Sequence, residues 1–490
     1  MHHSHVDGVP VLRSSRPGPL QATLRFGVGA RDETYRTRDV TRLVAALAAH
    51  ETRRRLPETA EPVVVSTGVD ETRFTVSGTP QEVADILRTL CRALGEPPPD
   101  GPDGTVYSCD DEAVVSLNPL AAAALNARYG AQATGLLGQE WVSCLPPTPD
   151  MLRTHAATWF TRANAVLTLA GPEPVGLRLP LPPGERPHHA APEARYPRAS
   201  WTHRTIEGVA VSVEASAGSA AVAVAHRILR ERMTAALARR STSAAPAEAA
   251  TVPHDTDADV RLLFTPATTD DAEEVAATVW AEALRLARIE PEQDEVDQHR
   301  GGVPESAEAQ PSTLDAAART ELFGMPGLVE GVTPGDVRDA WQRAMAGAQL
   351  VVPDGLLLDL AGPDGRRLWC TSCWTWDELP PWGEAFHEPL AKRAFRRAGE
   401  RHWTVLTTDS VVTCRTGAYH ALRFDDVVAL ERWGTERVLI GRCGCDIGIN
   451  PAWYRGGRRL IRALDEAVPA ELAFDGAEGG RSHEERPPRA

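Results

Sequence analysis

The chain has 490 residues, too many for one ordinary domain, and its hydrophobic fraction of 42% is enough for more than one buried core. The formal net charge of −15 argues against nucleic acid as the main partner, because phosphate binding requires a clustered basic surface. No run of residues approaches the roughly 20 apolar positions that span a bilayer, and the N-terminus lacks the basic, then apolar, order of a signal peptide. We therefore expect a cytoplasmic protein with no membrane span.

The predicted elements alternate between strands and helices, and their order occurs twice. Residues 20–30 predict a strand, 39–55 a helix, 61–79 two strands and 80–95 a helix. The same order returns from residue 207 to residue 288. This duplication predicts an α+β fold of two homologous lobes, each an antiparallel sheet with helices on one side.

The predicted organisation has six segments. The lobes occupy residues 1–175 and 199–352, and a proline-rich linker, 176–198, joins them. A Trp- and Pro-rich connector follows at 353–384. Residues 385–475 show short strands and one closing amphipathic helix, which predicts a small domain like a pleckstrin-homology (PH) domain, with a β-barrel and a C-terminal helix. Residues 476–490 predict a disordered tail.

Residues 27–33 read "GVGARDE", and three further stretches read "ETRFTVSGTPQEVADILRTLCRAL", "ATWFTRANAVLTLAGP" and "VTPGDVRDAWQRAM". On these stretches, residues 6–352 resemble the insulinase/pitrilysin family of inverted-motif zinc peptidases. In that family a strand with the ending G-x-G-[SA]-R-[DN]-E precedes the metal-binding helix. The resemblance implies the two-lobed insulinase-type fold for these residues, and the PH-like domain predicted at 385–475 follows it in the chain.

The residues that carry the family's chemistry are missing from this sequence. H-x-x-E-H supplies two imidazole ligands at i and i+4 and a general base at i+3. These positions fall at Arg42, Ala45 and Ala46, and no acidic residue between Glu112 and Glu140 supplies the third ligand. The resemblance therefore implies a catalytically degenerate member with no catalytic residue, no catalytic metal and no cofactor.

Two cysteine pairs suggest a different kind of site. Cys370 and Cys373 form C-x-x-C, and Cys443 and Cys445 form C-x-C. Four thiolates hold a structural zinc ion if the two pairs meet in space. The sequence favours core or incidental thiols instead, because cysteine is a common small core residue and no turn glycine follows the C-x-C pair.

The leading functional hypothesis is a pseudopeptidase subunit. It forms a homodimer, or a heterodimer with a catalytic insulinase-type subunit, and binds or positions a polypeptide substrate for a zinc-bearing partner. One alternative is a non-enzymatic scaffold or regulator that acts through the PH-like domain. Another is a zinc metalloendopeptidase with an unorthodox site, which would cleave a fluorogenic peptide when zinc is added.

Overall fold

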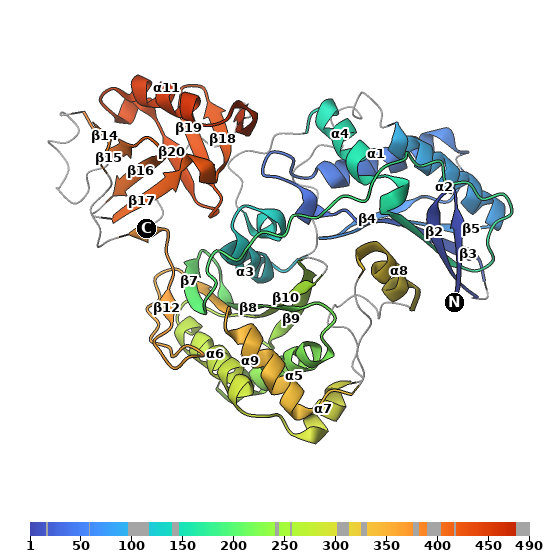
Figure 1. The fold of residues 1–490 in the computed structure, drawn as a ribbon, viewed down its shortest axis with the longest axis horizontal. Coiled ribbons are helices and arrows are strands. Elements are labelled where there is room, and N and C mark those ends of the chain that lie inside the picture. Colours follow the sequence, from blue (N-terminus) through green and yellow to red (C-terminus); the bar gives the residue numbers. More distant parts are fainter. Residues whose placement is uncertain are drawn as a thin grey trace.

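A computed structural model describes most of the chain, and Figure 1 shows that it forms two lobes and a C-terminal domain. The C-terminal domain is the part of the ribbon that carries the label α11, drawn mainly in red. The described residues are 1–15, 18–57, 59–96, 117–139, 147–240, 245–254, 257–300, 313–324, 331–375, 382–389, 403–415 and 418–476.

The first lobe is built on a six-stranded sheet with the order β1-β2-β6-β3-β5-β4. Its strands are β1 (His2–Val6), β2 (Val9–Ser14), β3 (Leu20–Phe26), β4 (Val64–Thr67), β5 (Thr72–Gly78) and β6 (Ala165–Ala170). The β2 and β6 strands are parallel, and the other neighbours are antiparallel. The helices that share the main core with this sheet are α1 (Val40–Arg55), α2 (Pro80–Gly95) and α4 (Pro149–Trp159).

The sequence of α2 shows why a helix forms here. The hydroxyl of Thr79 accepts a 3.4 Å hydrogen bond from the Glu82 amide, and the Glu82 carboxylate accepts a 2.8 Å bond from the Thr79 amide. Pro80 then fits the first helical position, where no amide hydrogen is needed. The apolar positions recur at helical spacing and are buried against the sheet: Val83, Ile86, Leu87, Leu90 and Leu94.

The second lobe repeats this architecture with the strand order β12-β7-β11-β8-β10-β9. Its strands are β7 (Ser200–Arg204), β8 (Gly208–Ser216), β9 (Glu248–Pro253), β10 (Ala258–Pro266), β11 (Gln349–Pro353) and β12 (Trp369–Cys370). Its helices are α5 (Ala220–Arg240), α6 (Ala272–Arg288), α7 (Gln293–Arg300) and α9 (Pro334–Met345). The parallel pair β7 and β11 corresponds to β2 and β6 in the first lobe. The predicted α+β fold of two homologous lobes is therefore confirmed.

Two helices cross from one lobe to the sheet of the other. The α3 helix (Pro119–Tyr129) follows the first lobe's α2 but packs on the second sheet, in one buried cluster with Val260 and Phe264. The α8 helix (Thr313–Phe323), in the equivalent place of the second repeat, packs on Leu12 and Val166 of the first sheet. Each sheet thus carries helices on both faces, whereas the sequence predicts helices on one side only. The physical reason is that the central strands are apolar on both faces and need a second cover.

Paired charges support the contact between α8 and the first lobe. Arg25 lies 3.3 Å from Glu71, and both side chains are 3% exposed; Arg25 also pairs with Asp315 of α8. Arg319 of α8 lies 2.6 Å from Asp70. Burial alone would raise the pKa of Asp70, but the charges of Arg319 and Arg31 lower it overall. Buried charges of this kind are tolerated because each one has a partner.

Residues 176–198, predicted as a linker, contain no regular element but lie fixed along the first lobe. Leu177, Leu179 and Leu181 are buried in its core. The Asp7 carboxylate accepts hydrogen bonds from the Leu179 amide at 2.8 Å and from Nε of Arg178 at 2.9 Å. This segment therefore connects the lobes and also completes the packing of the first one.

The C-terminal domain contains two sheets, with the orders β13-β17-β16-β15-β14 and β20-β19-β18-β21. Its elements are β13 (Trp374–Thr375), β14 (Glu384–His387), β15 (Trp403–Leu406), β16 (Ser410–Arg415), β17 (Ala418–Arg423), β18 (Val427–Trp433), β19 (Glu436–Gly441), β20 (Asp446–Ile449), α11 (Gly457–Ala467) and β21 (Ala473–Asp475). Leu460 and Leu464 of α11 share a core with both sheets. The expected closed barrel is not found in the described part of this domain, because the short helical turn at Phe424–Asp426 directs the chain from one sheet to the other. The PH-like assignment stays a prediction.

Some of the predicted segments fall where the structure gives no description. The predicted disordered tail lies outside the described residues apart from Gly476, as do residues 376–381 of the connector. Within the described ranges, no helix has both the length and the apolar character that crossing a bilayer requires.

Candidate functional site

The turn at residues 27–33 fixes where α1 begins. A Cβ on Gly29 would lie 2.4 Å from the carbonyl oxygen of Val69, so glycine alone allows this close approach to the β4–β5 hairpin. The amide of Arg31 donates a 3.0 Å hydrogen bond to the same carbonyl. The motif therefore joins the turn to the hairpin through close backbone contacts.

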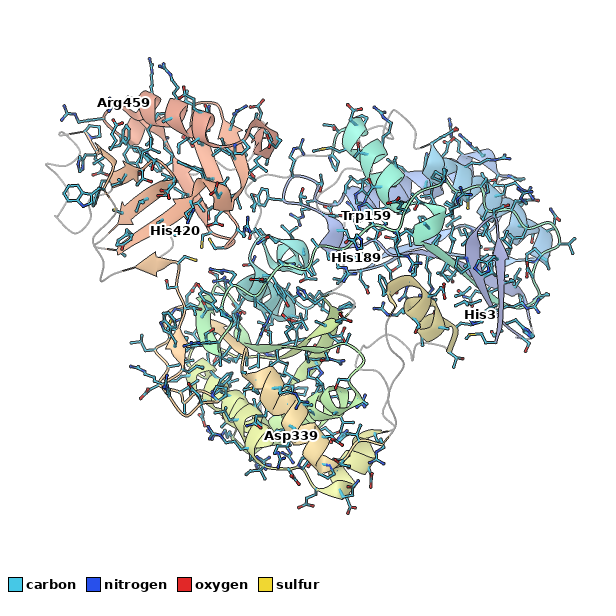
Figure 2. The ribbon with its side chains drawn as sticks, viewed as in Figure 1. His3, Trp159, His189, Asp339, His420 and Arg459 are labelled. Atoms are coloured by element: carbon cyan, nitrogen blue, oxygen red, sulfur yellow. The ribbon has the colours of Figure 1, made fainter. Side chains whose placement is uncertain are left out.

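Arg31 and Asp32 connect this turn to more distant parts of the chain. Nη1 of Arg31 donates a 3.3 Å hydrogen bond to the carbonyl of Pro253, at the end of β9 in the second lobe. Oδ1 of Asp32 is 2.7 Å from Nδ1 of His189, whose ring stacks on Trp159 with centroids 5.4 Å apart (Figure 2). These contacts give the motif a role in holding the lobes and the connecting segment together.

Glu33 caps the start of α1. Its carboxylate accepts hydrogen bonds from the amides of Asp39 at 2.8 Å and Thr41 at 3.0 Å. Asp39 has a φ of 63°, and its own side chain makes no capping bond. Burial raises the pKa of Glu33 to about 8, although the two amide bonds act in the opposite direction.

The positions that the sequence resemblance aligns with H-x-x-E-H lie in the first turns of α1. The side chain of Arg42 is 17% exposed, and its Nε is 3.8 Å from Oδ1 of Asp39. Ala45 is fully buried in the first core, and Ala46 is partly exposed. A methyl group has no atom that can bind a metal, and a guanidinium group repels a cation. A helix therefore forms over these three positions, and their side chains offer no metal ligand.

A pocket of about 370 Å³ opens beside Arg42. Its volume is within the usual range for small-ligand sites. It lies where the first lobe, α3 and the second lobe meet, and the lining includes Glu33, Asp39, Arg42, Pro119, Ala122 and Ile206.

The edge strand β4 leads into this pocket. Among the described strands, β4 pairs with β5 alone and is the last strand of its sheet. Val64 at its start is 62% exposed, and Thr67 at its end lines the pocket.

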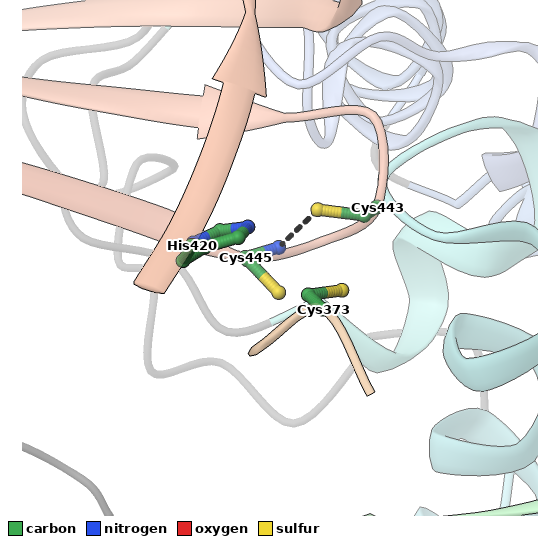
Figure 3. A group of neighbouring side chains, drawn as sticks. All are labelled: Cys373, His420, Cys443 and Cys445. Carbon is green, nitrogen blue, oxygen red and sulfur yellow. Dashed lines mark hydrogen bonds between the residues drawn. The ribbon is translucent and has the colours of Figure 1, made fainter. Parts of the chain in front are cut away.

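A second group of side chains lies at the boundary between the second lobe and the C-terminal domain (Figure 3). Cys373, His420, Cys443 and Cys445 have ligand atoms that all lie within 4.8 Å of one another. Cys373 comes from the segment between β12 and β13, His420 from β17, and the other two from the turn between β19 and β20. Cys370, which the sequence pairs with Cys373, lies in β12 and is not part of this group. His420 takes the fourth place, where the sequence predicts Cys370.

The pKa values of Cys373, His420 and Cys445 are shifted because these groups are buried close to one another. Hydrogen bonds with Cys443 and Cys445 lower the pKa of Cys373 far below the usual range for a thiol, although burial opposes this. Burial alone would lower the pKa of His420, but its hydrogen bonds with Cys373 and Cys443 and their negative charge raise this pKa to about 9. The same neighbours raise the pKa of Cys445. Negative charge on sulfur is therefore favoured at Cys373.

Comparison with known proteins identifies the fold. No protein-family model and no curated protein sequence matches this chain. Among solved structures, the peptidase M16 inactive domain from Pseudomonas fluorescens aligns with a TM-score of 0.56 and 13% identity, covering 73% of this chain and 98% of that one. A chain of Complex III2 from Candida albicans aligns with a TM-score of 0.53 and 11% identity, covering 72% and 95%. A protease from Helicobacter pylori aligns with a TM-score of 0.51 and 12% identity, covering 72% and 98%.

These similarities extend over nearly the full length of each solved chain but over less than three quarters of this one. The molecule therefore has the fold of the M16, or insulinase-like, proteins. Identities of 11% to 13% establish the fold alone and carry no activity with them.

Proposed function

We propose that this chain is a non-catalytic subunit of the insulinase type that binds an extended polypeptide and positions it for a zinc-bearing partner. The observation that supports the proposal is α1, a helix whose sequence aligns with the family's metal-binding helix but has Arg42, Ala45 and Ala46 at the ligand and base positions. One of the similar solved structures is itself described as an M16 inactive domain.

The missing third ligand supports the same proposal. Zinc hydrolysis requires three protein ligands, an open position for water and a nearby general base. The α3 helix lies beside α1 across the pocket, and its residues Pro119–Tyr129 include no acidic side chain. The group at Cys373 is no substitute, because it lies at the boundary with the C-terminal domain and none of its members lines the pocket.

The geometry of β4 supports polypeptide binding. An extended peptide adds to an open sheet edge through backbone hydrogen bonds, and pockets beside the strand then select its side chains. Since Thr67 lies both in β4 and in the pocket wall, a peptide paired with β4 would direct a side chain toward Arg42. A homodimer, or a heterodimer with a catalytic subunit, would enclose this surface.

Fluorescence anisotropy with labelled, unstructured peptides of about a dozen residues tests the binding. Arg42→Glu should weaken binding, whereas Arg53→Glu, an exposed position at the far end of the same helix, should not. N-methylation of alternate peptide amides should abolish binding in one register and preserve it in the other, because a strand donates from alternate residues.

The partner and the absence of hydrolysis need separate measurements. Light scattering coupled to size exclusion, with and without a homologue that retains H-x-x-E-H, should reveal a dimer. A strictly monomeric chain that binds neither peptide nor homologue would refute the proposal. Cleavage of a fluorogenic peptide by the chain alone, dependent on zinc, would favour the unorthodox peptidase instead.

A further inference from the structure

We propose that Cys373, His420, Cys443 and Cys445 bind one structural Zn²⁺ ion, which fixes the C-terminal domain on the second lobe. Three sulfur atoms and one imidazole nitrogen, all within 4.8 Å of one another, form a complete Cys₃His ligand set (Figure 3). Bonds of about 2.3 Å to sulfur and 2.0 Å to nitrogen place tetrahedral ligand atoms roughly 3.5 to 3.8 Å apart. The four side chains therefore need only a small inward movement to surround an ion.

The position of Cys373 makes this site a joint between two parts of the molecule. On one side of it, the amide of Thr371 donates a 2.7 Å hydrogen bond to the carbonyl of Trp201 in the second lobe. On the other side, Trp374 pairs with His420 in the five-stranded sheet of the C-terminal domain. An ion bound to Cys373 and His420 would thus tie the second lobe's edge to that sheet.

The turn from Cys443 to Cys445 is shaped to present both sulfur atoms. Gly444, with a φ of +83°, stands between them and supplies the left-handed residue that the turn requires. The carbonyl of Cys445 accepts a 2.8 Å hydrogen bond from the Gly441 amide. The Cys445 amide donates to Sγ of Cys443 at 3.4 Å, drawn as the dashed line in Figure 3. The turn glycine that was expected after the pair therefore lies within it.

Side chains around the four ligands balance their charge and hold them in position. Nη2 of Arg195 donates a hydrogen bond to Sγ of Cys373 at 2.9 Å. Three thiolates and a neutral imidazole around Zn²⁺ carry a net charge of about −1, which one guanidinium neutralises. Nε2 of Gln139 donates a 3.1 Å hydrogen bond to the carbonyl of Gly444, and Nδ2 of Asn126 in α3 donates to Oε1 of Gln139 at 3.0 Å. Hydrogen bonds to the ligands from residues that do not bind the metal are typical of protein metal sites.

The ligand set also indicates what the ion would do. Four protein ligands leave no open position for water, so the ion would be structural and not hydrolytic. Thiolates with one imidazole favour Zn²⁺ over hard cations such as Mg²⁺ or Ca²⁺. This inference is independent of the proposed peptide binding.

Metal analysis of the full-length chain, purified under reducing conditions and incubated with ZnCl₂, tests the proposal. Inductively coupled plasma mass spectrometry should find about one tightly bound zinc ion per chain. X-ray absorption at the zinc edge should show three sulfur neighbours near 2.3 Å and one nitrogen near 2.0 Å. That signature separates the proposed site from the exposed histidines of β1, which offer nitrogen alone.

Variants with a matched control complete the test. Cys443→Ser and His420→Asn should each lower zinc retention against a chelator at least tenfold, whereas Cys370→Ser, at the nearby cysteine outside the group, should retain the parent value. The absorption spectrum of the parent decides the question even if a ligand variant does not fold. Failure to retain zinc after incubation, a nitrogen-only coordination shell, or a disulfide between Cys443 and Cys445 in reduced preparations would each overturn the proposal.

Discussion

The hydroxyl of Tyr35 donates a 2.9 Å hydrogen bond to the carboxylate of Glu431, and the two residues are 4% and 0% exposed. Tyr35 lies in the turn before α1, and Glu431 lies in β18, so the bond joins the first lobe to the C-terminal domain. Nε1 of Trp433 donates to the other carboxylate oxygen at 2.9 Å. A buried carboxylate at a domain boundary is thus satisfied from both sides.

Tyr35→Phe should lower the free energy of unfolding by about 1 to 3 kcal/mol, because it removes a hydrogen bond to a buried charged group and leaves the ring in place. Urea unfolding measures this change. In a double-mutant cycle, Tyr35→Phe should lower the free energy of unfolding much less in the Glu431→Gln variant than in the parent chain. Additive effects of the two substitutions would show that the bond contributes nothing.

Gly130→Ala should disrupt the contact between α3 and the C-terminal domain. Gly130 has a φ of +68°, and an added Cβ would lie 1.9 Å from the carbonyl oxygen of Arg442. Gly176→Ala is the matched control, since Gly176 has a φ of +72° and no atom within 4 Å of the added Cβ. Both variants bear left-handed strain of about 1 to 2 kcal/mol. In thermal unfolding, a Gly130 variant no less stable than the Gly176 variant would contradict this packing.

Arg195→Met should weaken zinc binding at the proposed site by about 10- to 100-fold, as expected for the loss of a polar group outside the ligands. Competition with a chromophoric chelator measures the affinity. Arg198→Met, at an exposed position on the same segment, should leave it unchanged. Equal affinities for the two variants would mean that the 2.9 Å contact of Arg195 with Cys373 does not tune the site.

The stability of the chain should fall as the pH rises from 5 to 8, in part because of Glu33. Its pKa is raised from 4.5 to about 8 in the folded chain, so across this window the folded state retains a proton that the unfolded state has lost. We expect a contribution of about 1 to 3 kcal/mol, less than the full linkage, because water reaches part of the side chain.

Glu33→Gln should flatten this part of the pH profile in denaturant titrations. Glu82→Gln is the control, because the Thr79 hydrogen bonds lower the pKa of Glu82 and its contribution is already complete above its unfolded pKa. A parent-like slope in the Glu33 variant would show that another group causes the dependence.

Ala45→Glu should destabilise the chain by about 3 kcal/mol or more, because it places an unpaired carboxylate in the first core. Ala46→Glu, one residue further and partly exposed, should cost less than about 1 kcal/mol. Unfolding free energies of the two variants make the comparison. Equal tolerance at both positions would mean that the place of the general base remains open to solvent.

Local patterns predicted the elements well, because each depends on nearby residues. The Thr79, Pro80 and Glu82 cap marks the start of α2, and the same periodicities in both halves revealed the duplication. The crossing of α3 and α8 could not be read in this way. Their apolar faces show only that they are buried, not which sheet covers them.

The two candidate sites also differ in whether their residues lie close together in the sequence. Arg42, Ala45 and Ala46 were assigned from the resemblance to H-x-x-E-H, a motif that lies within one helix and can be aligned from sequence alone. His420 was missed because strand pairing brings it to Cys373 across a long stretch of chain. The available signal was weak: an imidazole within the apolar strand β17.

Because α3 and α8 each pack on the sheet of the other lobe, the chain cannot finish folding its first lobe while it is being synthesised. Leu12 and Val166 of the first sheet are covered by α8, whose residues Thr313–Phe323 leave the ribosome long after that sheet has been synthesised. The nascent first lobe must therefore wait with one apolar face uncovered, a state that chaperones recognise. A ribosome stalled between the two lobes would expose this face, and its first lobe should be more sensitive to protease than the same residues in the finished protein.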